Sequence, residues 1–365
     1  MLPKIAILGA SGFVGSRLLE MFHLRQMAIL QPVVRNFSSL ARLARFDLDW
    51  CIADARDQAA MTKAFSGCDA VVNLIAADPA IIVENATASY LAAKAAGVKR
   101  MVFMSSASVH GQAPEPGTDE SSLLHTHHRF AYNNAKVCAE RALIALRKSS
   151  SVELSILRPG IVFGPRSRWV KDIADQLLSD SAYLIDDGQG ICNSIYVDNL
   201  IEAIGLALTV PAADRDVFIV GDRERVTWLE FYQHIADGLG RDLSCVHRLE
   251  APQFKNGLTE KFVALRAGKP VQALLPLVPS SLKEAVKGAM HAVTAPPAPS
   301  PWALPNQTGP QVTEEFVALH QCSVQLPWKK AESILGYQPI VSFAEGMKRS
   351  IGWLEFAGYQ VRPDF

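Results

Sequence analysis

The chain alternates short apolar runs with longer stretches whose apolar residues recur at helical spacing. The apolar runs are residues 4–8, 31–35, 70–75, 100–104 and 154–157. Their length and their glycine or polar flanks predict buried strands. Helices are expected over residues 13–24 and near residues 56–66 and 84–96. This alternation predicts an α/β fold, a doubly wound parallel sheet with right-handed crossovers and helices on both faces.

The pattern changes in the last third of the chain. Residues 294–310 contain six prolines, which predicts a long surface loop or lid instead of a regular helix or interior strand. Residues 271–293 are apolar and predict a packed helical lobe, with a membrane-surface element as the alternative. We therefore divide the chain into residues 1–240, with segments of a second lobe after about residue 165, and a C-terminal region, residues 241–365.

Composition narrows the functional classes. The 365 residues are 49% hydrophobic, enough for a sizeable core, and 36 basic residues balance 36 acidic ones, so no nucleic-acid partner is expected. The six cysteines form no Cys-x-x-Cys pair, so we expect neither a disulfide framework nor a zinc site, and we expect a cytoplasmic location. The N-terminal apolar run is too short for a secretion signal. No apolar run reaches the roughly 18 residues that a spanning helix needs.

A glycine-rich loop directly follows the first predicted strand. Gly9, Gly12 and Gly15 lie between this strand and the next helix, so backbone N–H groups and the helix N-terminus face an anion. Gly9 permits the turn, Gly12 the close approach of a phosphate, and Gly15 close packing of helix on strand. The pattern predicts binding of a dinucleotide pyrophosphate. Further cofactor contacts are expected from Ser11, Phe13 and Val14.

The residue at the end of the second predicted strand indicates which dinucleotide is bound. Arg35 lies 20 residues after Gly15. An acidic residue there would bind the ribose hydroxyls of NAD, whereas a cation suits the 2′-phosphate of NADP. We therefore expect NADP, with NAD as the alternative cofactor and a merely solvated Arg35 as the alternative structural role. Arg42 and Arg45 on the following segment would assist.

Two further segments carry candidate chemistry. Tyr132 and Lys136 are four residues apart in a predicted helix, so their side chains point the same way. Ser105, Ser106 and Ser108 follow the strand at 100–104. They therefore lie at the carboxyl edge of a parallel sheet, where such folds bind ligands.

These motifs occur together in the order of a known family. The glycine loop, "ADARD" around Asp54, "NLIAA", the serine segment, Tyr-x-x-x-Lys, "LRPGIVFGP" and "IYVDNL" resemble the extended short-chain dehydrogenase/reductase superfamily. Its members include nucleotide-sugar epimerases, dehydratases and 3β-hydroxysteroid dehydrogenases. The resemblance covers roughly residues 3–240, with a weaker match at 326–354. It implies a Rossmann-type NAD(P)-binding domain with a smaller, mostly helical C-terminal substrate lobe, and a homodimer.

The resemblance implies roles for individual residues. Tyr132 would be the general acid/base, and Lys136 would favour its phenolate and hold the nicotinamide ribose. Ser106 would hydrogen-bond the reacting oxygen, with Ser105 as its rival. Other cofactor contacts implied are Asp54 to the adenine amino group, the backbone of Ala76 and Ala77, and Pro159 and Val162 beside the nicotinamide. The expected substrate contacts are Ser108, His110, Arg166, Asn193 and Tyr196, with simple packing as the alternative for His110.

Departures from the family pattern narrow the range of reactions and substrate classes that we expect. Ala107 and Ser108 stand where 4,6-dehydratases carry an Asp-Glu pair, which argues against dehydration. Cys192 stands where nucleotide-sugar enzymes usually carry a diphosphate-binding arginine, and cysteine cannot replace that contact. The segment that often supplies a second arginine to nucleotide-sugar enzymes is also absent. Lys329 or Lys330 is a candidate for this phosphate contact, with solvated lysines as the alternative.

Three hypotheses follow. The leading one is an NADP-dependent oxidoreductase that interconverts a secondary alcohol and a ketone on a mid-sized, apolar small molecule. The runner-up is a nucleotide-sugar epimerase or 4-ketoreductase of surface-polysaccharide assembly. The third is a cofactor-binding scaffold without chemistry, against which the intact Ser106, Tyr132 and Lys136 argue. The histidines of "HTHHR" at 125–129 have no carboxylate or cysteine partner in sequence, so no metal site is expected.

Overall fold

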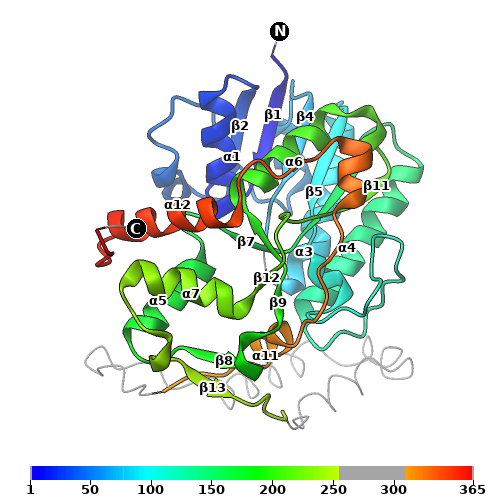
Figure 1. Cartoon of the computed structure of the whole chain (residues 1–365). Coiled ribbons are helices and arrows are strands. Elements are labelled where there is room, and N and C mark those ends of the chain that lie inside the picture. The colour runs from blue at the N-terminus through cyan, green and yellow to red at the C-terminus, as the bar shows by residue number, and fades with distance from the viewer. Residues whose placement is uncertain (1, 77, 255–308, 364–365) are drawn as a thin grey trace, which may run out of the picture. The chain divides into compact units, whose positions relative to one another are not determined.

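A central sheet of seven parallel strands organises the protein. The computed structural model describes residues 2–76, 78–254 and 309–363. The strands follow the order β11-β6-β5-β4-β1-β2-β3 (Figure 1). Their bounds are Lys4–Leu8 (β1), Ile29–Val34 (β2), Cys51–Ile52 (β3), Ala70–Asn73 (β4), Arg100–Met104 (β5), Glu153–Pro159 (β6) and Asp216–Val220 (β11). Each adjacent pair is parallel. The predicted doubly wound sheet is confirmed.

Both faces of the sheet are covered, which explains why its strands are apolar throughout. In β1, Ile5 and Ile7 pack into one core, and Ala6 and Leu8 pack into another on the opposite face. The helices of the first face are α1 (Phe13–Leu24) and α6 (Val197–Thr209). Those of the second face are α2 (Gln58–Ala64), α3 (Pro79–Ala95) and α4 (Ala131–Lys148) (Figure 1).

Helix α3 begins earlier than the sequence pattern predicted. The apolar spacing indicated a start near residue 84, but the helix starts at Pro79. The Asp78 carboxylate accepts a hydrogen bond from Ala80 N at 2.9 Å and caps the first turn. Proline suits this turn because its missing N–H has no helical partner there. The Asp-Pro pair therefore adds a turn of helix before the apolar stripe begins.

A second group of elements forms the predicted C-terminal lobe. Its helices are α5 (Arg168–Leu178), α7 (Trp228–Leu239), α11 (Glu314–His320) and α12 (Phe343–Phe356). Its strands pair as β7 (Ile161–Phe163) with β10 (Ser194–Tyr196), β8 (Tyr183–Ile185) with β13 (His247–Leu249), and β9 (Ile191–Cys192) with β12 (Val226–Thr227). Residues 1–250 and 310–365 form one compact unit. The functional boundary at residue 240 stays a prediction.

The expectations for residues 271–293 and most of the proline-rich segment 294–310 lie outside the described residues. No described helix is long and apolar enough to cross a membrane. All six cysteines are described, and none forms a disulfide.

The lobe is packed around aromatic rings. Trp228 of α7 stacks on His320 of α11, with ring centres 4.6 Å apart. His320 is 2% exposed, and its Nδ1 accepts a hydrogen bond from Ile185 N at 3.2 Å. The Nε2 atom is buried without a partner among the described residues. Burial lowers the pKa of His320 to about 3, so this ring is neutral inside the lobe.

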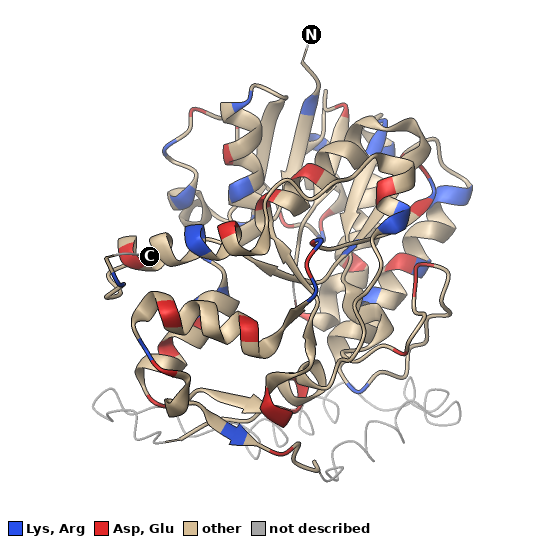
Figure 2. Cartoon of the chain, in the orientation of Figure 1, with Lys and Arg blue, Asp and Glu red and all other residues tan. Residues whose placement is uncertain are grey.

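Charged groups connect the elements and cover one edge of the sheet. Figure 2 shows basic and acidic residues interspersed along the helices and strands. Arg17 of α1 bonds Asp198 of α6 at 2.7 Å. At edge strand β11, Lys330 forms an ion pair with Asp216. Glu120 Oε1 accepts the hydrogen bond of Ile219 N at 2.8 Å. Lys330 is thus committed to the edge of the sheet.

Candidate active site

The glycine loop folds as the sequence predicted. Gly9 follows β1 with a φ of +76°, and Gly12 N donates to Gly9 O at 3.0 Å. A Cβ atom on Gly15 would lie 2.2 Å from Gly9 O, so only glycine lets α1 start this close to the strand. Strand β1 lies between β2 and β4, where the strand order reverses. Open α/β sheets bind ligands at such a point, and the loop fits a dinucleotide pyrophosphate.

The residues expected at the adenosine end lie beside this loop. Arg35 follows β2 and is exposed. Arg42 Nη1 donates to Ser11 O at 3.2 Å, whereas Arg45 pairs with Glu20. Asp54 follows β3, and the hydrogen bond from Arg56 lowers its pKa to about 2. The carboxylate of Asp54 is therefore ionised and already partnered.

The loop after β4 is fixed by a buried amide that the sequence reading missed. Asn73 Nδ2 donates to Asn85 Oδ1 at 3.1 Å and to Ser89 Oγ at 2.9 Å. Asn73 Oδ1 accepts a hydrogen bond from Ile75 N at 3.1 Å. These bonds hold the backbone that leads to Ala76, which lines the main cavity. Ala77 lies outside the described residues.

A cavity of about 430 Å³ joins the carboxyl ends of the strands to the lobe. Nine residues predicted for the site line it: Phe13, Val14, Ala76, Ser106, Ser108, Tyr132, Pro159, Val162 and Asn193. Lining residues that the sequence reading missed include Met104, Gln112, Trp169, Glu315, Leu319 and Leu326. Most of the lining is apolar. The cavity therefore brings together the serine segment, the tyrosine helix and α11.

One face of α4 carries Tyr132, Lys136 and Glu140 at four-residue spacing. Lys136 is 1% exposed, and its Nζ donates to Met104 O at 2.7 Å. The ammonium lies 5.7 Å from the centre of the Tyr132 ring. Burial lowers the pKa of Lys136 to about 8, and the Glu140 carboxylate opposes this shift. Tyr132 and Lys136 thus lie on one face of α4, as their four-residue spacing predicted.

The pKa of the Tyr132 phenol is raised, whereas we expected Lys136 to lower it. Burial raises the pKa of Tyr132 to about 12, and the Glu315 carboxylate raises it further. Lys136 is not among the causes of this pKa shift, and its ammonium donates to the carbonyl of Met104. Tyr132 is therefore protonated at neutral pH in this structure, ready to donate a proton.

The two candidate serines have different partners. Ser105 Oγ donates to the buried carboxylate of Glu140 at 2.5 Å. Ser106 Oγ accepts hydrogen bonds from Ser108 N at 3.2 Å and Ser108 Oγ at 2.9 Å. Ser106 therefore still has its own proton to donate toward the cavity, whereas the proton of Ser105 is committed. This difference favours Ser106 for the reacting oxygen.

A buried ion pair supports the serine segment from behind. Arg158 Nη2 bonds Glu140 Oε2 at 2.6 Å, and both side chains are almost fully buried. Arg158 Nη1 also lies 3.1 Å from His110 Nε2. Burial and the Arg158 charge lower the pKa of His110 to about 4. His110 is not among the residues that line the cavity, and its role as a substrate contact or a packing residue stays a prediction.

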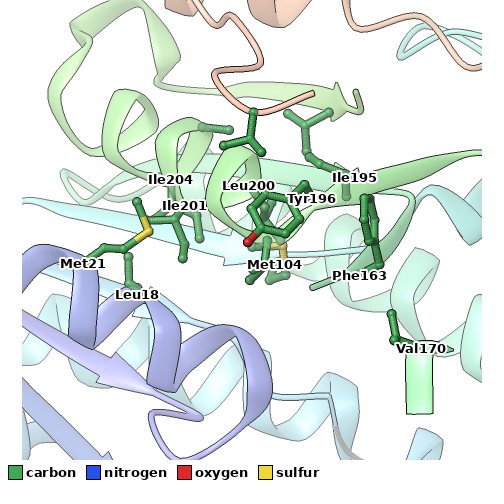
Figure 3. Packing of buried hydrophobic residues seen from close by; sticks show 14 of the residues in the cluster. Leu18, Met21, Met104, Phe163, Val170, Ile195, Tyr196, Leu200, Ile201 and Ile204 are labelled. Atoms are coloured by element: carbon green, nitrogen blue, oxygen red, sulfur yellow. The ribbon is translucent and has the colours of Figure 1, made fainter. Parts of the chain in front are cut away.

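Two other predicted substrate contacts, Tyr196 and Arg166, are also not among the residues that line the cavity. Tyr196 is 0% exposed and packs against Phe163 with ring centres 5.4 Å apart (Figure 3). A Cβ atom on Gly346 would lie 2.7 Å from its ring, which shows how tightly α12 covers it. Arg166 is exposed and does not line the cavity, whereas Arg168 does. Tyr196 therefore belongs to the core.

Asn193 lines the cavity, but its side-chain amide is hydrogen-bonded to the backbone of the C-terminal segment. Its Nδ2 donates to Val324 O at 2.9 Å, and its Oδ1 accepts from Leu326 N at 2.8 Å. A Cβ atom on Gly160 would lie 1.9 Å from Asn193 O. Asn193 thus fixes the returning C-terminal segment at the cavity wall.

The histidine-rich loop borders the tyrosine helix. The rings of His125 and His128 stack with centres 4.0 Å apart, and His128 Nε2 lies 2.9 Å from Val109 O. Within the described part of the chain, no group of three or more His, Cys, Asp or Glu side chains is arranged to hold a metal ion.

Comparison with known proteins fits this geometry. Residues 5–221 match the NAD dependent epimerase/dehydratase family. The chain belongs to this family. Its motifs predicted this family, which fits the extended short-chain dehydrogenase/reductase superfamily of enzymes.

Relatives of this family member act on different substrates. The chain is 26% identical to 3beta-hydroxysteroid-dehydrogenase/decarboxylase isoform 2 of Arabidopsis thaliana over 94% of this chain, and it spans 61% of that protein. It is 29% identical to N-acetyl-alpha-D-glucosaminyl-diphospho-ditrans,octacis-undecaprenol 4-epimerase of Escherichia coli O157:H7, over 68% of this chain and 76% of that protein.

A solved structure shows the same fold. UDP-glucuronic acid 4-epimerase from Bacillus cereus, in complex with NAD, matches with a TM-score of 0.70 at 16% identity. The match covers 98% of this chain and all of that one.

Proposed function

We propose that the protein interconverts a secondary alcohol and a ketone, with Tyr132 as the proton donor and acceptor. The observation that carries this proposal is that Ser106 and Tyr132 line one largely apolar cavity at the carboxyl end of the sheet. Ser106 would donate a hydrogen bond to the carbonyl oxygen and orient it toward the phenol. Tyr132 would deliver a proton to that oxygen during reduction. The nicotinamide cofactor supplies the hydride when bound.

Lys136 would position Tyr132 and the cofactor. Its buried ammonium lies over the phenol ring and beside the carboxyl end of β5. Proton loss from Tyr132 creates a negative charge in an apolar site, and a nearby ammonium stabilises that charge. Lys136 therefore supports the reaction most when alcohol is oxidised, since Tyr132 is then the base.

NADP is the proposed cofactor, with NAD as the alternative. Arg35 and Arg42 provide cations near the glycine loop, where a 2′-phosphate would bind. Replacing Arg35→Ala removes a charge-assisted contact of about 1.5–3 kcal/mol, so NADPH affinity should fall at least tenfold while NADH affinity stays the same. Tryptophan fluorescence titration measures both, and Arg25→Ala, after the far end of α1 and paired with Glu202, is the matched control. Equal loss for both cofactors would refute the role of Arg35.

The alternative function is a nucleotide-sugar epimerase or 4-ketoreductase. The names of two relatives favour it, the undecaprenol-linked 4-epimerase of Escherichia coli and UDP-glucose 4-epimerase of Vibrio cholerae, because both names describe diphosphate-linked sugars. The position expected for a diphosphate-binding arginine holds Cys192, which is 2% exposed and packs in the core. A buried thiol cannot grip a diphosphate, so we rank this alternative second.

Net redox chemistry separates the two functions. The purified protein is incubated with NADPH or NADH and either cyclohexanone-type and steroid-type ketones or UDP-, GDP- and dTDP-sugars. Loss of nicotinamide absorbance with a ketone, abolished in Tyr132→Phe, supports the proposal. Conversion of a sugar nucleotide without net cofactor turnover would replace it by epimerisation.

A homodimer and a cytoplasmic location remain proposals that rest on the family resemblance and on composition. Light scattering of the purified chain tests the dimer.

A further inference from the structure

We infer that Glu315 selects the substrate by charge: its carboxylate accepts a hydrogen bond from a hydroxyl or ammonium group of the ketone and excludes ligands that carry an anion there. This inference rests on the proposed function, because it concerns the same cavity. It names a substrate class, a largely apolar ketone that is neutral or cationic and has a hydrogen-bond donor near the reacting carbon.

Glu315 faces the cavity from the far end of the chain. It lies in the first turn of α11 and lines the cavity together with Tyr132. Its neighbour Glu314 is instead paired with Arg129. In the described ranges, no lysine or arginine forms an ion pair with Glu315. Among the described residues, the cavity lining therefore contains a carboxylate, on an exposed side chain, that takes part in no ion pair.

The carboxylate is held by a fixed amide. Gln112 Nε2 donates to Glu315 Oε1 at 3.2 Å. Asn133 Nδ2 donates to Gln112 Oε1 at 2.8 Å, which sets the direction of the Gln112 amide. Asn133 is 0% and Gln112 is 9% exposed, so neither amide is free to rotate into water. Because a carboxylate has about four acceptor sites, several remain available to a ligand.

Among the described residues that line the cavity, Arg168 is the other charged one. Its side chain is 91% exposed, and its Nε lies 3.7 Å from Asp172. The Glu315 carboxylate raises the pKa of the Tyr132 phenol, which is the direction expected of a negative charge near that hydroxyl. A ligand anion placed beside Glu315 would be repelled, and such repulsion is an effective source of specificity.

A matched series of ketones tests the inference. 4-Hydroxycyclohexanone, the ammonium form of 4-aminocyclohexanone and 4-oxocyclohexanecarboxylate share one ring and differ in charge. With NADPH, the protein should reduce the first two with kcat/KM at least tenfold above that of the carboxylate. Glu315→Gln should reduce the ammonium-to-carboxylate ratio at least tenfold, mainly through KM, and Glu315→Asp should keep it. Glu355→Gln, at an exposed position of α12, is the control and should leave the ratio unchanged.

The pH profile gives a second readout that a merely structural role would not move. The basic limb that reports Tyr132 should shift to lower pH in Glu315→Gln, because a neighbouring negative charge is lost. An active Glu315→Gln with an unchanged ratio and an unchanged limb would overturn the inference.

The failure of the proposed function is distinguishable. If the wild-type chain reduces none of these ketones, the redox proposal fails for this class. The inference is then decided by the dissociation constants of the same three probes for the NADPH-loaded chain, measured by the fluorescence of the tryptophans. If the carboxylate probe binds most weakly, and if Glu315→Gln removes this difference in affinity, the result supports selection by Glu315. Equal affinities overturn it.

Discussion

At the scale of single residues, hydrogen-bond partners separate side chains that look equivalent in sequence. Ser105 and Ser106 are adjacent and both line the cavity. The hydroxyl of Ser105 completes the hydrogen bonding of Glu140, whose other partner is Arg158. The hydroxyl of Ser106 accepts two bonds and keeps its proton. These partners support a structural role for Ser105 and the proposed catalytic role of Ser106.

Replacing each serine by alanine should separate these roles. Ser106→Ala removes a hydrogen bond to the developing charge on oxygen and should lower kcat by about 10²-fold. Ser105→Ala leaves part of a buried carboxylate unsatisfied and should lower the free energy of unfolding by about 1–3 kcal/mol. Steady-state kinetics and urea denaturation of both variants measure the two effects. The reverse pattern would assign the reacting oxygen to Ser105.

The sequence predicts a residue's role well only where the spacing is local. Tyr132 and Lys136 were predicted because four-residue spacing places them on one helix face. Tyr196 and His110 were predicted as substrate contacts but do not line the cavity, because a polar atom near the motif does not reveal whether the side chain turns into the core. Glu315 was missed because only the return of the chain to the cavity brings α11 beside Tyr132.

At the scale of elements, the unit made of β1, the glycine loop and α1 depends on close backbone contact. The helix start lies so near Gly9 that a methyl group on residue 15 has no room. The buried strands and their crossover helices were predictable, because burial on both faces makes the strands apolar throughout. Element starts set by capping residues, such as α3 at Asp78, were less predictable than the apolar stripes.

Gly15→Ala should separate α1 from the strand. The added Cβ would meet the Gly9 carbonyl at 2.2 Å, so the loop must shift and dinucleotide affinity should fall at least tenfold. The matched control is Gly352→Ala in α12, where nothing lies within 4 Å of the added atom. That control should gain about 0.5–1 kcal/mol, because alanine is the better helix former. Unchanged NADPH binding by Gly15→Ala would contradict the assigned role of the loop.

At the scale of the whole molecule, one buried histidine links the stability of the lobe to pH. The pKa of His320 falls from an ordinary 6.5 to about 3 on folding. The unfolded chain therefore binds more protons than the folded one between these values. This contribution to stability is fully present above pH 6.5 and is lost as the pH falls toward 3.

His320 should contribute a slope of about 1.4 kcal/mol per pH unit to the free energy of unfolding over this pH window. His320→Gln keeps an acceptor for Ile185 N but does not titrate, so the variant should lose this part of the slope. The difference in unfolding free energy between the two chains, measured by urea denaturation from pH 4 to 7, isolates the effect. It also cancels the opposite contribution of Asp222, whose pKa burial raises to about 7. His247→Gln, at an exposed site, should leave the slope as in the wild type.

The two edges of the sheet have a consequence for the protein at high concentration. An edge strand with free N–H groups is a template for pairing with a second chain, and long apolar edges promote aggregation. Here β11 presents an ion pair to any incoming strand, and Glu120 already occupies the N–H of Ile219. At the other edge, β3 has two residues only. Strand addition between molecules would first have to break these contacts or proceed on too short a template, so the fold resists self-assembly into fibres.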